Sequence, residues 1–345
     1  MKNYLIKLGK NSKKALLNNV SSNKKNKVLK DYVKLILDNQ SKILLGNLKD
    51  IKIAKKNKLK ENLIKRLLLD KKKILQITNS IKTIIGFKDP VDRILKKWKR
   101  PNGLKIEKKT IPIGVIAVIY ESRPNVTTDV AALCFKSGNP VILKGGSEAF
   151  YSNKILANLF IRALKKNNIN KNYVQFIESR NRKIVDLLLT KMFNYIDVII
   201  PRGGKSLVKK VQNLSKIPII GHLEGVCHTY IDLKADLSMS KKITLNAKLR
   251  NSAICGATET ILIHQKILNK FCNPILLNLE KNGCQIIGDK QIKKFYKGKI
   301  KTAKESDWHK EYLGPIVSVK SVNDLNEAIN HINKYGTMHT DAIIT

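Results

Sequence analysis

The sequence of 345 residues has no run of about 18 apolar residues, the length at which a segment becomes a candidate membrane span. The apolar stretch at its N-terminus, within residues 1–7, is too short for a signal peptide. The opening residues carry lysine but no arginine, which disfavours a transit peptide. We therefore expect a cytoplasmic protein with no membrane partner.

Cysteine is scarce, at positions 134, 227, 255, 272 and 284, and is not spaced for a disulfide framework or a zinc ribbon. The odd number and the absence of CxxC favour reduced thiols. Cys227 stands beside His228, but adjacent side chains on a strand point to opposite faces, which makes the pair a poor metal site. We therefore expect no metal.

Arginine and aromatic residues are also scarce, although the formal net charge is +41. Only nine of the 67 basic residues are arginine, the residue suited to bidentate contacts with phosphates and bases. Aromatic residues make up 6% of the chain and do not alternate with the lysines as a stacking surface requires. Lysine rises together with isoleucine and asparagine, all of which use A/T-rich codons. The charge therefore indicates a solvated lysine surface, and a nucleic-acid-binding protein is an alternative that rests on net charge alone.

The chain is long enough for two domains, and its pattern changes near residue 111. Residues 1–85 space leucine and isoleucine by three or four, which predicts helices with lysine-rich outer faces, one of them over 63–85. Turn residues occur at 86–90 and 100–103. From 111 to 201, β-branched runs alternate with helical segments, which predicts a parallel sheet with crossover helices. The predicted strands are 113–120, 140–143, 173–177, 198–201, 217–220, 228–231 and 260–263, with another beginning at 340–345, and the predicted helices are 127–137, 149–167 and 182–191.

Loops that follow predicted strands carry groups suited to anions. Ligands of parallel sheets bind at the carboxyl ends of the strands, where the loops 121–129, 144–148 and 201–206 lie. The last two place glycines beside a cation and a hydroxyl group, so their backbone N–H groups can hold a phosphate ahead of a helix. A capped turn is the structural alternative for 121–129, and Lys144 is also one lysine among many.

Cys255 follows a predicted helix that carries Lys248 and Arg250, and it precedes a run of small residues. A free thiol has a pKa of about 8.5, and nearby cations or exposed backbone N–H groups would increase its thiolate fraction. The alternative is a buried small hydrophobic residue. A serine in place of Cys255 would not be ionised at neutral pH, and no neighbouring histidine at the right spacing is evident to activate it.

A set of short motifs follows in a fixed order along essentially the whole chain. The motifs are Asp-Pro-Val (89–91), Trp98, Pro-Asn-Gly-Leu (101–104), Ile-Pro-Ile-Gly-Val-Ile-Ala-Val-Ile-Tyr-Glu-Ser-Arg-Pro-Asn-Val-Thr (111–127), Ile-Leu-Lys-Gly-Gly-Ser-Glu-Ala (142–149), Ile-Pro-Arg-Gly-Gly (200–204), His-Leu-Glu-Gly-Val-Cys-His (222–228), the Cys255 segment (246–260), Glu-Tyr-Leu-Gly-Pro-Ile (311–316) and His-Ile-Asn-Lys-Tyr-Gly (331–336). Each motif alone is weak, whereas the ordered set is highly specific. In this set the chain resembles the γ-glutamyl phosphate reductase (glutamate-5-semialdehyde dehydrogenase) family of the aldehyde dehydrogenase superfamily.

The resemblance implies an aldehyde-dehydrogenase-like α/β fold, with a Rossmann-type parallel-sheet cofactor domain and an α/β catalytic domain. The implied domains are residues 1–225, with the N-terminal helices and the NADP-binding domain, and residues 226–345, the catalytic domain. Family members continue well past the segment that matches 339–345, so we expect a catalytic domain that is incomplete at its C-terminal end. The family forms homo-oligomers with the help of that further segment, so we do not expect the oligomer here.

The reaction that the resemblance implies is NADPH-dependent reduction of L-glutamyl 5-phosphate to L-glutamate 5-semialdehyde and phosphate, the second step of proline biosynthesis from glutamate. Cys255 matches the nucleophile, whose thiolate would displace phosphate and form a thioester that hydride from NADPH reduces. NADP(H) is thus the expected cofactor, and glutamate 5-kinase is a candidate partner. The alternatives are an inactive truncated homologue and an aldehyde dehydrogenase that acts on another acyl phosphate.

Further residues match the family's binding loops. His222 stands where hydrolysing aldehyde dehydrogenases carry a general-base glutamate, which an enzyme that releases its thioester by hydride transfer does not need. An acyl phosphate needs cationic and hydrogen-bonding partners, which the loop 121–129 offers. The implied substrate-binding residues are Ser122, Arg123, Asn125 and His222. The implied cofactor-binding residues are Lys144, Gly145, Gly146, Ser147, Arg202, Gly203, Gly204 and Ser206.

Overall fold

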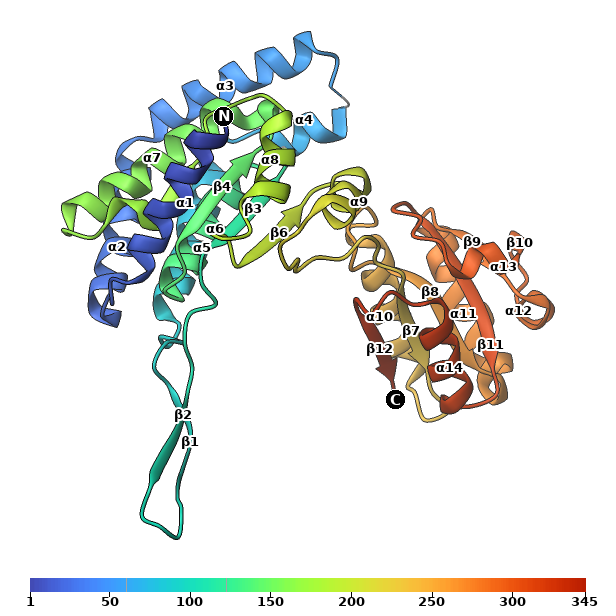
Figure 1. Ribbon diagram of the computed structural model, residues 1–345. Coiled ribbons are helices and arrows are strands. Elements are labelled where there is room, and N and C mark those ends of the chain that lie inside the picture. The colour runs from blue at the N-terminus through green and yellow to red at the C-terminus, as the bar shows by residue number, and fades with distance from the viewer. Residues whose placement is uncertain (60, 122) are drawn as a thin grey trace. The chain divides into compact units, whose positions relative to one another are not determined.

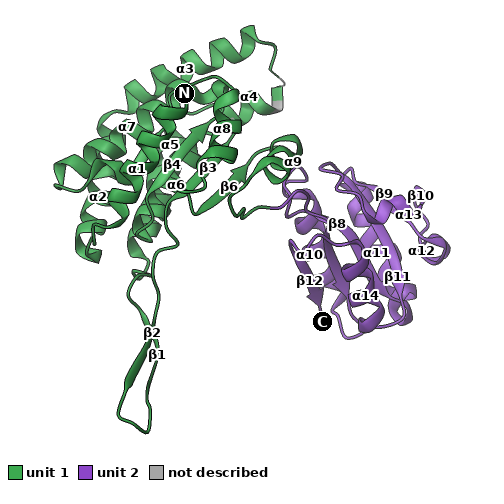
Figure 2. Cartoon of the chain, viewed as in Figure 1, with its two compact units in different colours: residues 1–221 green, residues 222–345 purple. Residues whose placement is uncertain are grey.

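The computed structural model describes residues 1–59, 61–121 and 123–345, with all of their side chains except that of Asn62. The chain divides into two compact units, residues 1–221 and 222–345 (Figure 2). No helix in these described ranges is both long enough and apolar enough to cross a membrane.

Unit 1 combines N-terminal helices, a hairpin and a parallel sheet (Figure 1). Its elements are α1 (Lys2–Leu16), α2 (Ser22–Asp38), α3 (Gln40–Lys56), α4 (Glu61–Leu67), α5 (Lys71–Gly86), β1 (Ile94–Lys99), β2 (Lys105–Lys109), β3 (Ile116–Tyr120), α6 (Pro124–Lys136), β4 (Val141–Gly145), the 3₁₀ helix η1 (Ser147–Ala149), α7 (Phe150–Lys166), η2 (Lys171–Tyr173), β5 (Val174–Phe176), α8 (Lys183–Lys191), β6 (Val198–Arg202) and α9 (Lys205–Leu214). Four parallel strands form its sheet in the order β5-β4-β3-β6.

The sheet of unit 1 is buried on both faces. Successive side chains of its strand β3 pack alternately into two hydrophobic cores, one on each face. Ile116, Val118 and Tyr120 pack with apolar residues of α2, α5, α6 and α7. Ala117 and Ile119 pack on the other face with α1, α8 and α9. This two-sided burial is the reason for the unbroken β-branched run in the sequence. The predicted strands at 113–120, 140–143, 173–177 and 198–201 are confirmed as β3 to β6, and the three predicted helices as α6, α7 and α8.

Two predictions for unit 1 are wrong. The helix expected over 63–85 is broken between α4 and α5, because the Asp70 carboxylate accepts a hydrogen bond from the Lys73 N–H at 2.6 Å and so caps the start of α5. The strand expected at 217–220 is reduced to a single bridge between Ile199 and Ile219. The apolar pattern of 217–220 arises because Ile217 packs into the core beside the sheet.

The β1–β2 hairpin was not predicted, although the turn at 100–103 was. The two strands pair antiparallel, and Gly103, with φ +89°, donates its N–H to the Arg100 carbonyl at 2.9 Å. Every residue of β1 is exposed, so the alternation of buried and exposed positions that marks a strand is absent. The hairpin extends away from the rest of unit 1 (Figure 1).

Unit 2 is a second α/β unit around a six-stranded sheet in the order β10-β9-β11-β8-β7-β12, in which every pair is parallel. Its elements are β7 (Cys227–Ile231), α10 (Leu237–Leu249), β8 (Thr258–His264), η3 (Gln265–Ile267), α11 (Leu268–Lys281), β9 (Gln285–Gly288), α12 (Lys290–Phe295), β10 (Ile300–Thr302), α13 (Glu305–Trp308), β11 (Ile316–Val322), α14 (Leu325–Tyr335) and β12 (Asp341–Ile344). The strands predicted at 228–231, 260–263 and 340–345 are confirmed as β7, β8 and β12. The two sheets confirm the predicted α/β class.

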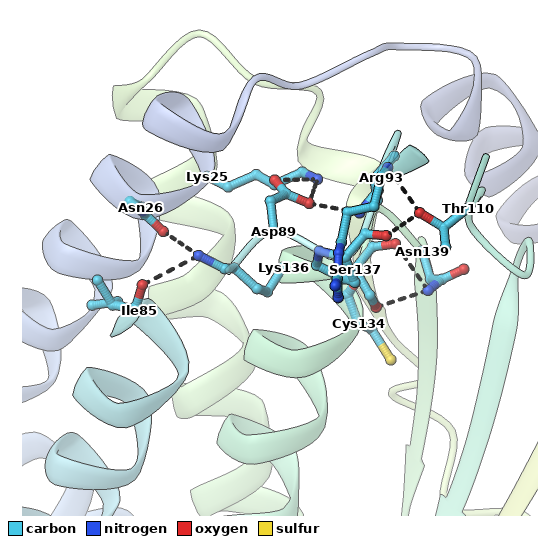
Figure 3. Close-up of polar contacts among 12 residues, drawn as sticks. Lys25, Asn26, Ile85, Asp89, Arg93, Thr110, Cys134, Lys136, Ser137 and Asn139 are labelled. Atoms are coloured by element: carbon cyan, nitrogen blue, oxygen red, sulfur yellow. Dashed lines mark hydrogen bonds and ion pairs between the residues drawn. The ribbon is translucent and has the colours of Figure 1, made fainter. Parts of the chain in front are cut away.

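Two buried lysines of unit 1 bind acceptors on other elements, Lys25 at the base of the hairpin and Lys136 on α2 and α5 (Figure 3). The Lys25 ammonium of α2 contacts both carboxylate oxygens of Asp89 at 3.1 and 3.0 Å, and Asp89 also accepts from the Val91 N–H at 3.0 Å. The Lys136 ammonium of α6 donates to the Asn26 side chain at 2.6 Å and to the Ile85 carbonyl at 3.2 Å. Burial lowers the pKa of Lys136, which depends on these acceptors in place of water.

We expect Asp89→Asn to lower the free energy of opening of α2 by about 3 kcal/mol, because Lys25 is only 3% exposed and would lose its counter-charge. Urea-dependent amide hydrogen exchange of peptides from α2 measures this. The matched control is Asp31→Asn, which removes the partner of the exposed Lys166 and should cost less than about 1 kcal/mol. Equal effects of the two substitutions would show that burial does not make the Lys25–Asp89 ion pair more important than the exposed one.

Two buried histidines lie in contact in unit 2. The rings of His228 and His331 are 5.5 Å apart, and the Nε2 atoms of both are buried without a hydrogen-bond partner in the described residues. Burial, the Lys320 ammonium and His228 lower the pKa of His331 to about 3. Burial also lowers the pKa of His228, although its Nδ1 lies 3.0 Å from an Asp341 carboxylate oxygen. Both rings are therefore neutral in the folded chain near neutral pH.

We expect unit 2 to lose stability as the pH falls below about 6.5, because the unfolded chain then binds protons that the folded histidines exclude. Each such histidine contributes up to about 1.4 kcal/mol per pH unit until its folded pKa is reached. Trp308, whose ring lies 5.5 Å from His331, reports unfolding by fluorescence once Trp98 is replaced by Phe. His331→Phe should flatten the pH dependence between pH 6.5 and about 4. An unchanged slope would show that other groups cause the acid sensitivity.

Candidate active site

Cys255 is the accessible cysteine of the chain. It lies in the loop between α10 and β8, half-buried, whereas the other four cysteines are buried. Burial raises the pKa of Cys134 and Cys272 to about 12 and that of Cys227 and Cys284 to about 11. Cys255 is therefore the thiol that a substrate can reach.

Two histidines lie beside this thiol. One ligand atom of each of His222, Cys255 and His339 falls within 4.8 Å of the others. The two imidazole rings are 4.3 Å apart at an interplanar angle of 84°, and His339 Nδ1 lies 2.9 Å from the Thr340 hydroxyl oxygen. No histidine near Cys255 in the sequence was evident, and folding brings these two to it from distant positions. His339 follows Cys255 by several strands and helices, so sequence spacing gave no signal for it.

The backbone of Cys255 is fixed by a close approach of residues 225–227. A Cβ atom at Gly225 would lie 2.0 Å from the Cys255 carbonyl oxygen, so only glycine fits there. The Gly225 N–H donates to a Glu311 carboxylate oxygen at 2.9 Å, and the Val226 N–H to the Thr337 hydroxyl at 3.0 Å. The Cys227 thiol lies 3.1 Å from the Cys255 carbonyl oxygen. Residues 225–227, themselves held by Glu311 and Thr337, thus hold the cysteine loop in place.

Lys248 does not supply the cation expected near the thiol. Its side chain is fully buried and forms an ion pair with Glu259, which is also fully buried. Glu259 in turn accepts from the Leu313 N–H at 3.2 Å. Burial raises the pKa of Glu259, and the hydrogen bond from Lys248 counteracts that effect. The pair therefore ties α10 to β8, the two elements that flank the Cys255 loop. Through Glu259 it also ties them to the segment around Leu313.

The cluster of His222, Cys255 and His339 also offers one sulfur and two imidazole ligands. Zn²⁺ takes such donors, usually with a fourth ligand that is absent from this group of three. The same arrangement suits a thiol that acts as a nucleophile next to a proton acceptor.

The loop after β4 places a buried cation near a half-buried carboxylate in unit 1. Lys144, 7% exposed, ends β4 with Gly145, and its ammonium donates to the Gly145 carbonyl at 2.7 Å. Burial lowers the pKa of Lys144, an effect that the Glu148 charge counteracts. Glu148 Oε2 is buried without a partner in the described residues, and it would lie 2.2 Å from a Cβ at Gly146. An unsatisfied acceptor beside a lysine fits the paired hydroxyl groups of a ribose.

The loop after β6 brings Gly203 and Gly204 to the start of α9. The Gly204 N–H donates to a Glu121 carboxylate oxygen at 2.8 Å, and a Cβ at Gly203 would lie 2.7 Å from that oxygen. A carboxylate thus stands at the helix N-terminus, where backbone N–H groups favour anions. Arg202 ends β6, and Ser206 lies in the first turn of α9.

The predicted substrate-binding residues fall in both units. Arg123 precedes α6 at its N-cap position, and Asn125 lies in the first turn, where its amide donates to Asp129 at 3.3 Å. His222 belongs to unit 2, with Cys255. Ser122 lies outside the described residues.

Comparisons with known proteins identify the family. A model of the aldehyde dehydrogenase family matches residues 14–291. The gamma-glutamyl phosphate reductase of Bartonella quintana is 44% identical over 331 residues, which cover 96% of this chain and 80% of the relative. The gamma-glutamyl phosphate reductase of Clostridium tetani is 41% identical in an alignment of 353 residues, which covers 99% of this chain and 82% of that relative.

A solved structure supports the same assignment. The crystal structure of gamma-glutamyl phosphate reductase from Thermotoga maritima has a TM-score of 0.93 and 36% identity, covering 99% of this chain and 82% of that chain. The chain therefore belongs to the aldehyde dehydrogenase family and, within it, to the gamma-glutamyl phosphate reductases.

Proposed function

We propose that the chain reduces L-glutamyl 5-phosphate to L-glutamate 5-semialdehyde and phosphate with NADPH, in the cytoplasm, as the second step of proline biosynthesis from glutamate. The observation that carries the proposal is the half-buried Cys255 thiol beside His222 and His339 in a chain 44% identical to a gamma-glutamyl phosphate reductase. The family assignment makes the chain an oxidoreductase that uses a nicotinamide cofactor.

Cys255 is the proposed nucleophile. Its thiol gives a proton to a neighbouring imidazole nitrogen of His222 or His339, and the sulfur attacks the C5 carbonyl carbon of the acyl phosphate. The C–O bond to phosphate breaks, and a thioester remains on Cys255. After hydride addition to the thioester carbon, the C–S bond breaks, the aldehyde leaves, and the sulfur takes back the proton that the imidazole holds. The close packing of Gly225 keeps the cysteine backbone fixed while these bonds form and break.

Unit 1 is the proposed site for the cofactor, and the residues present fit it. The Lys144 ammonium and the unsatisfied Glu148 carboxylate oxygen suit ribose hydroxyl groups. The start of α9 suits a pyrophosphate through its backbone N–H groups, and the Glu121 carboxylate that accepts from the Gly204 N–H must give way to it. Gly145 and Gly146 pack too closely on Asn153 and Glu148 to carry a side chain, and they and Ser147 are the proposed contacts of the cofactor at this strand end. Bound NADPH supplies the hydride for reduction of the thioester. Arg180, stacked 4.2 Å from the Phe150 ring centroid, provides a cation next to this loop for the additional phosphate of NADP.

Arg123 and Asn125 are proposed to contact the substrate. Arginine suits the phosphate of an acyl phosphate, and the half-buried position of Arg123 ahead of α6 places its charge at a helix N-terminus. Because the substrate is an acyl phosphate, the enzyme depends on a kinase that acts on the side-chain carboxylate of glutamate. Glutamate 5-kinase is the proposed partner on that ground.

We expect Cys255→Ser to lower the rate of NADP reduction with glutamate 5-semialdehyde and phosphate at least about a hundredfold, because serine is not ionised at neutral pH. NADPH affinity, measured by fluorescence titration, should remain close to that of the wild type. Cys134→Ala, which removes a buried thiol from unit 1, is the control for loss of a cysteine and should keep its activity. More than a tenth of the wild-type rate in Cys255→Ser would disprove the nucleophile assignment.

Lys144→Ala should raise the dissociation constant of NADPH by the equivalent of about 1–3 kcal/mol, because a charge-assisted hydrogen bond is lost. Cofactor fluorescence titration measures it. Lys183→Ala, at an exposed lysine that begins α8, is the matched control and should leave the affinity unchanged. Equal affinities of the two variants would exclude Lys144 from the cofactor site.

A further inference from the structure

Unit 1 contains a cavity of about 330 Å³ that the proposed cofactor loops do not line. It lies where the break between α4 and α5 meets the first turns of α6, and it combines groups of both charges with an apolar wall. Its lining residues are Arg66, Leu68, Leu69, Lys73, Gln76, Ile77, Ser80, Asn125 and Asp129.

Asp129 is the one acid of this lining, and half of its carboxylate is unsatisfied. Oδ2 accepts a hydrogen bond of 3.3 Å from the Asn125 amide. Oδ1 is buried and has no partner in the described residues. A buried carboxylate oxygen without a donor is costly to maintain, and an ammonium group would satisfy it. Burial raises the pKa of Asp129 in the absence of such a partner.

The opposite charge comes from Arg66 and Lys73. The Lys73 ammonium donates to the Leu68 carbonyl at 2.6 Å and to the Lys65 carbonyl at 3.2 Å, which holds it at the end of α4 with one N–H left for a ligand. Arg66 presents a planar fork of donors that matches a carboxylate. The lining therefore contains an acceptor for a cation and donors for a carboxylate.

The break between the two helices is rigidly held, so these charges are fixed before a ligand arrives. Asn47 is 1% exposed; its amide donates to the Leu67 carbonyl at 2.9 Å and its oxygen accepts from the Leu69 N–H at 2.8 Å. The same amide lies 3.1 Å from the Ser152 hydroxyl. These bonds fix the backbone at 67–69, between Arg66 and Lys73, both of which line the cavity.

We propose that this cavity binds the α-ammonium and α-carboxylate of an amino acid, and that this amino acid is the glutamate part of the substrate. The ammonium contacts Asp129, the carboxylate contacts Arg66 and Lys73, and Leu69 and Ile77 line the space for the methylene groups. A phosphate or another simple anion fits less well, because the Asp129 carboxylate would repel it. The second half of the proposal rests on the proposed function, whereas the first half does not.

The first test is equilibrium binding to the full chain by titration calorimetry, with L-glutamate and with glutarate, which lacks the ammonium group. Asp129→Asn should weaken L-glutamate binding about tenfold or more and change glutarate binding less than about threefold. Arg66→Gln should weaken both ligands, and Lys65→Gln, at the exposed neighbour of Arg66, should weaken neither. Arg66 is exposed, so its replacement does not endanger folding. Wild-type affinity for L-glutamate in both cavity variants would overturn the proposal.

The second test separates the substrate from a free amino acid acting as an effector. In the semialdehyde assay, Asp129→Asn should raise KM for glutamate 5-semialdehyde about tenfold with little change in kcat, and should not raise KM for 5-oxopentanoate, which lacks the amino group. L-glutamate should compete with the semialdehyde. Asp129-dependent glutamate binding without competition would overturn the second half of the proposal alone. Asp129-dependent binding in a chain without any turnover would contradict the proposed function and leave the cavity assignment intact.

Discussion

The close approach of Gly225 to the carbonyl group of Cys255 is the constraint on which the reactive centre depends. No side chain fits between them, and residues 225–227 are tied by hydrogen bonds to Glu311, Thr337 and the cysteine itself. This contact fixes the cysteine loop between α10 and β8 while leaving the thiol half-buried beside two imidazoles. The chemistry that we propose requires a sulfur that is accessible and held in one geometry.

A few buried lysines differ from the many exposed ones. Among the lysines that the structure describes, four are buried, at positions 25, 136, 144 and 248, and each has an acceptor built for it. Lys25 and Lys248 pair with carboxylates, Lys136 with an amide and a carbonyl, and Lys144 with the carbonyl next to it. Three of them join elements of the fold. Lys144, at a strand end beside an unsatisfied carboxylate oxygen, is the one that we propose for the cofactor.

Elements whose burial leaves a local pattern in the sequence were predicted correctly. Strands buried on both faces leave β-branched runs, and β3 and β4 were therefore predicted close to their true bounds. The exposed β1 leaves no such pattern. The break between α4 and α5 is capped by Asp70 and is also held by Asn47, which is distant in sequence. Cys255 could be chosen from its motif, but its partner His339 and the burial of Lys248 follow from the packing of separate segments. Asp129 and Arg66 gave no signal in sequence, because only the folded helices bring them to one cavity.

The central claim is that Cys255 carries the acyl group during the reaction. The most direct measurement is mass spectrometry of the full chain mixed with L-glutamyl 5-phosphate, generated in place by glutamate 5-kinase with ATP and glutamate, in the absence of NADPH. The account predicts a mass gain of one glutamyl group on the peptide that contains Cys255, and its loss when NADPH is added. An unmodified Cys255 under conditions in which the chain turns over, or a glutamyl group on another residue, would contradict it.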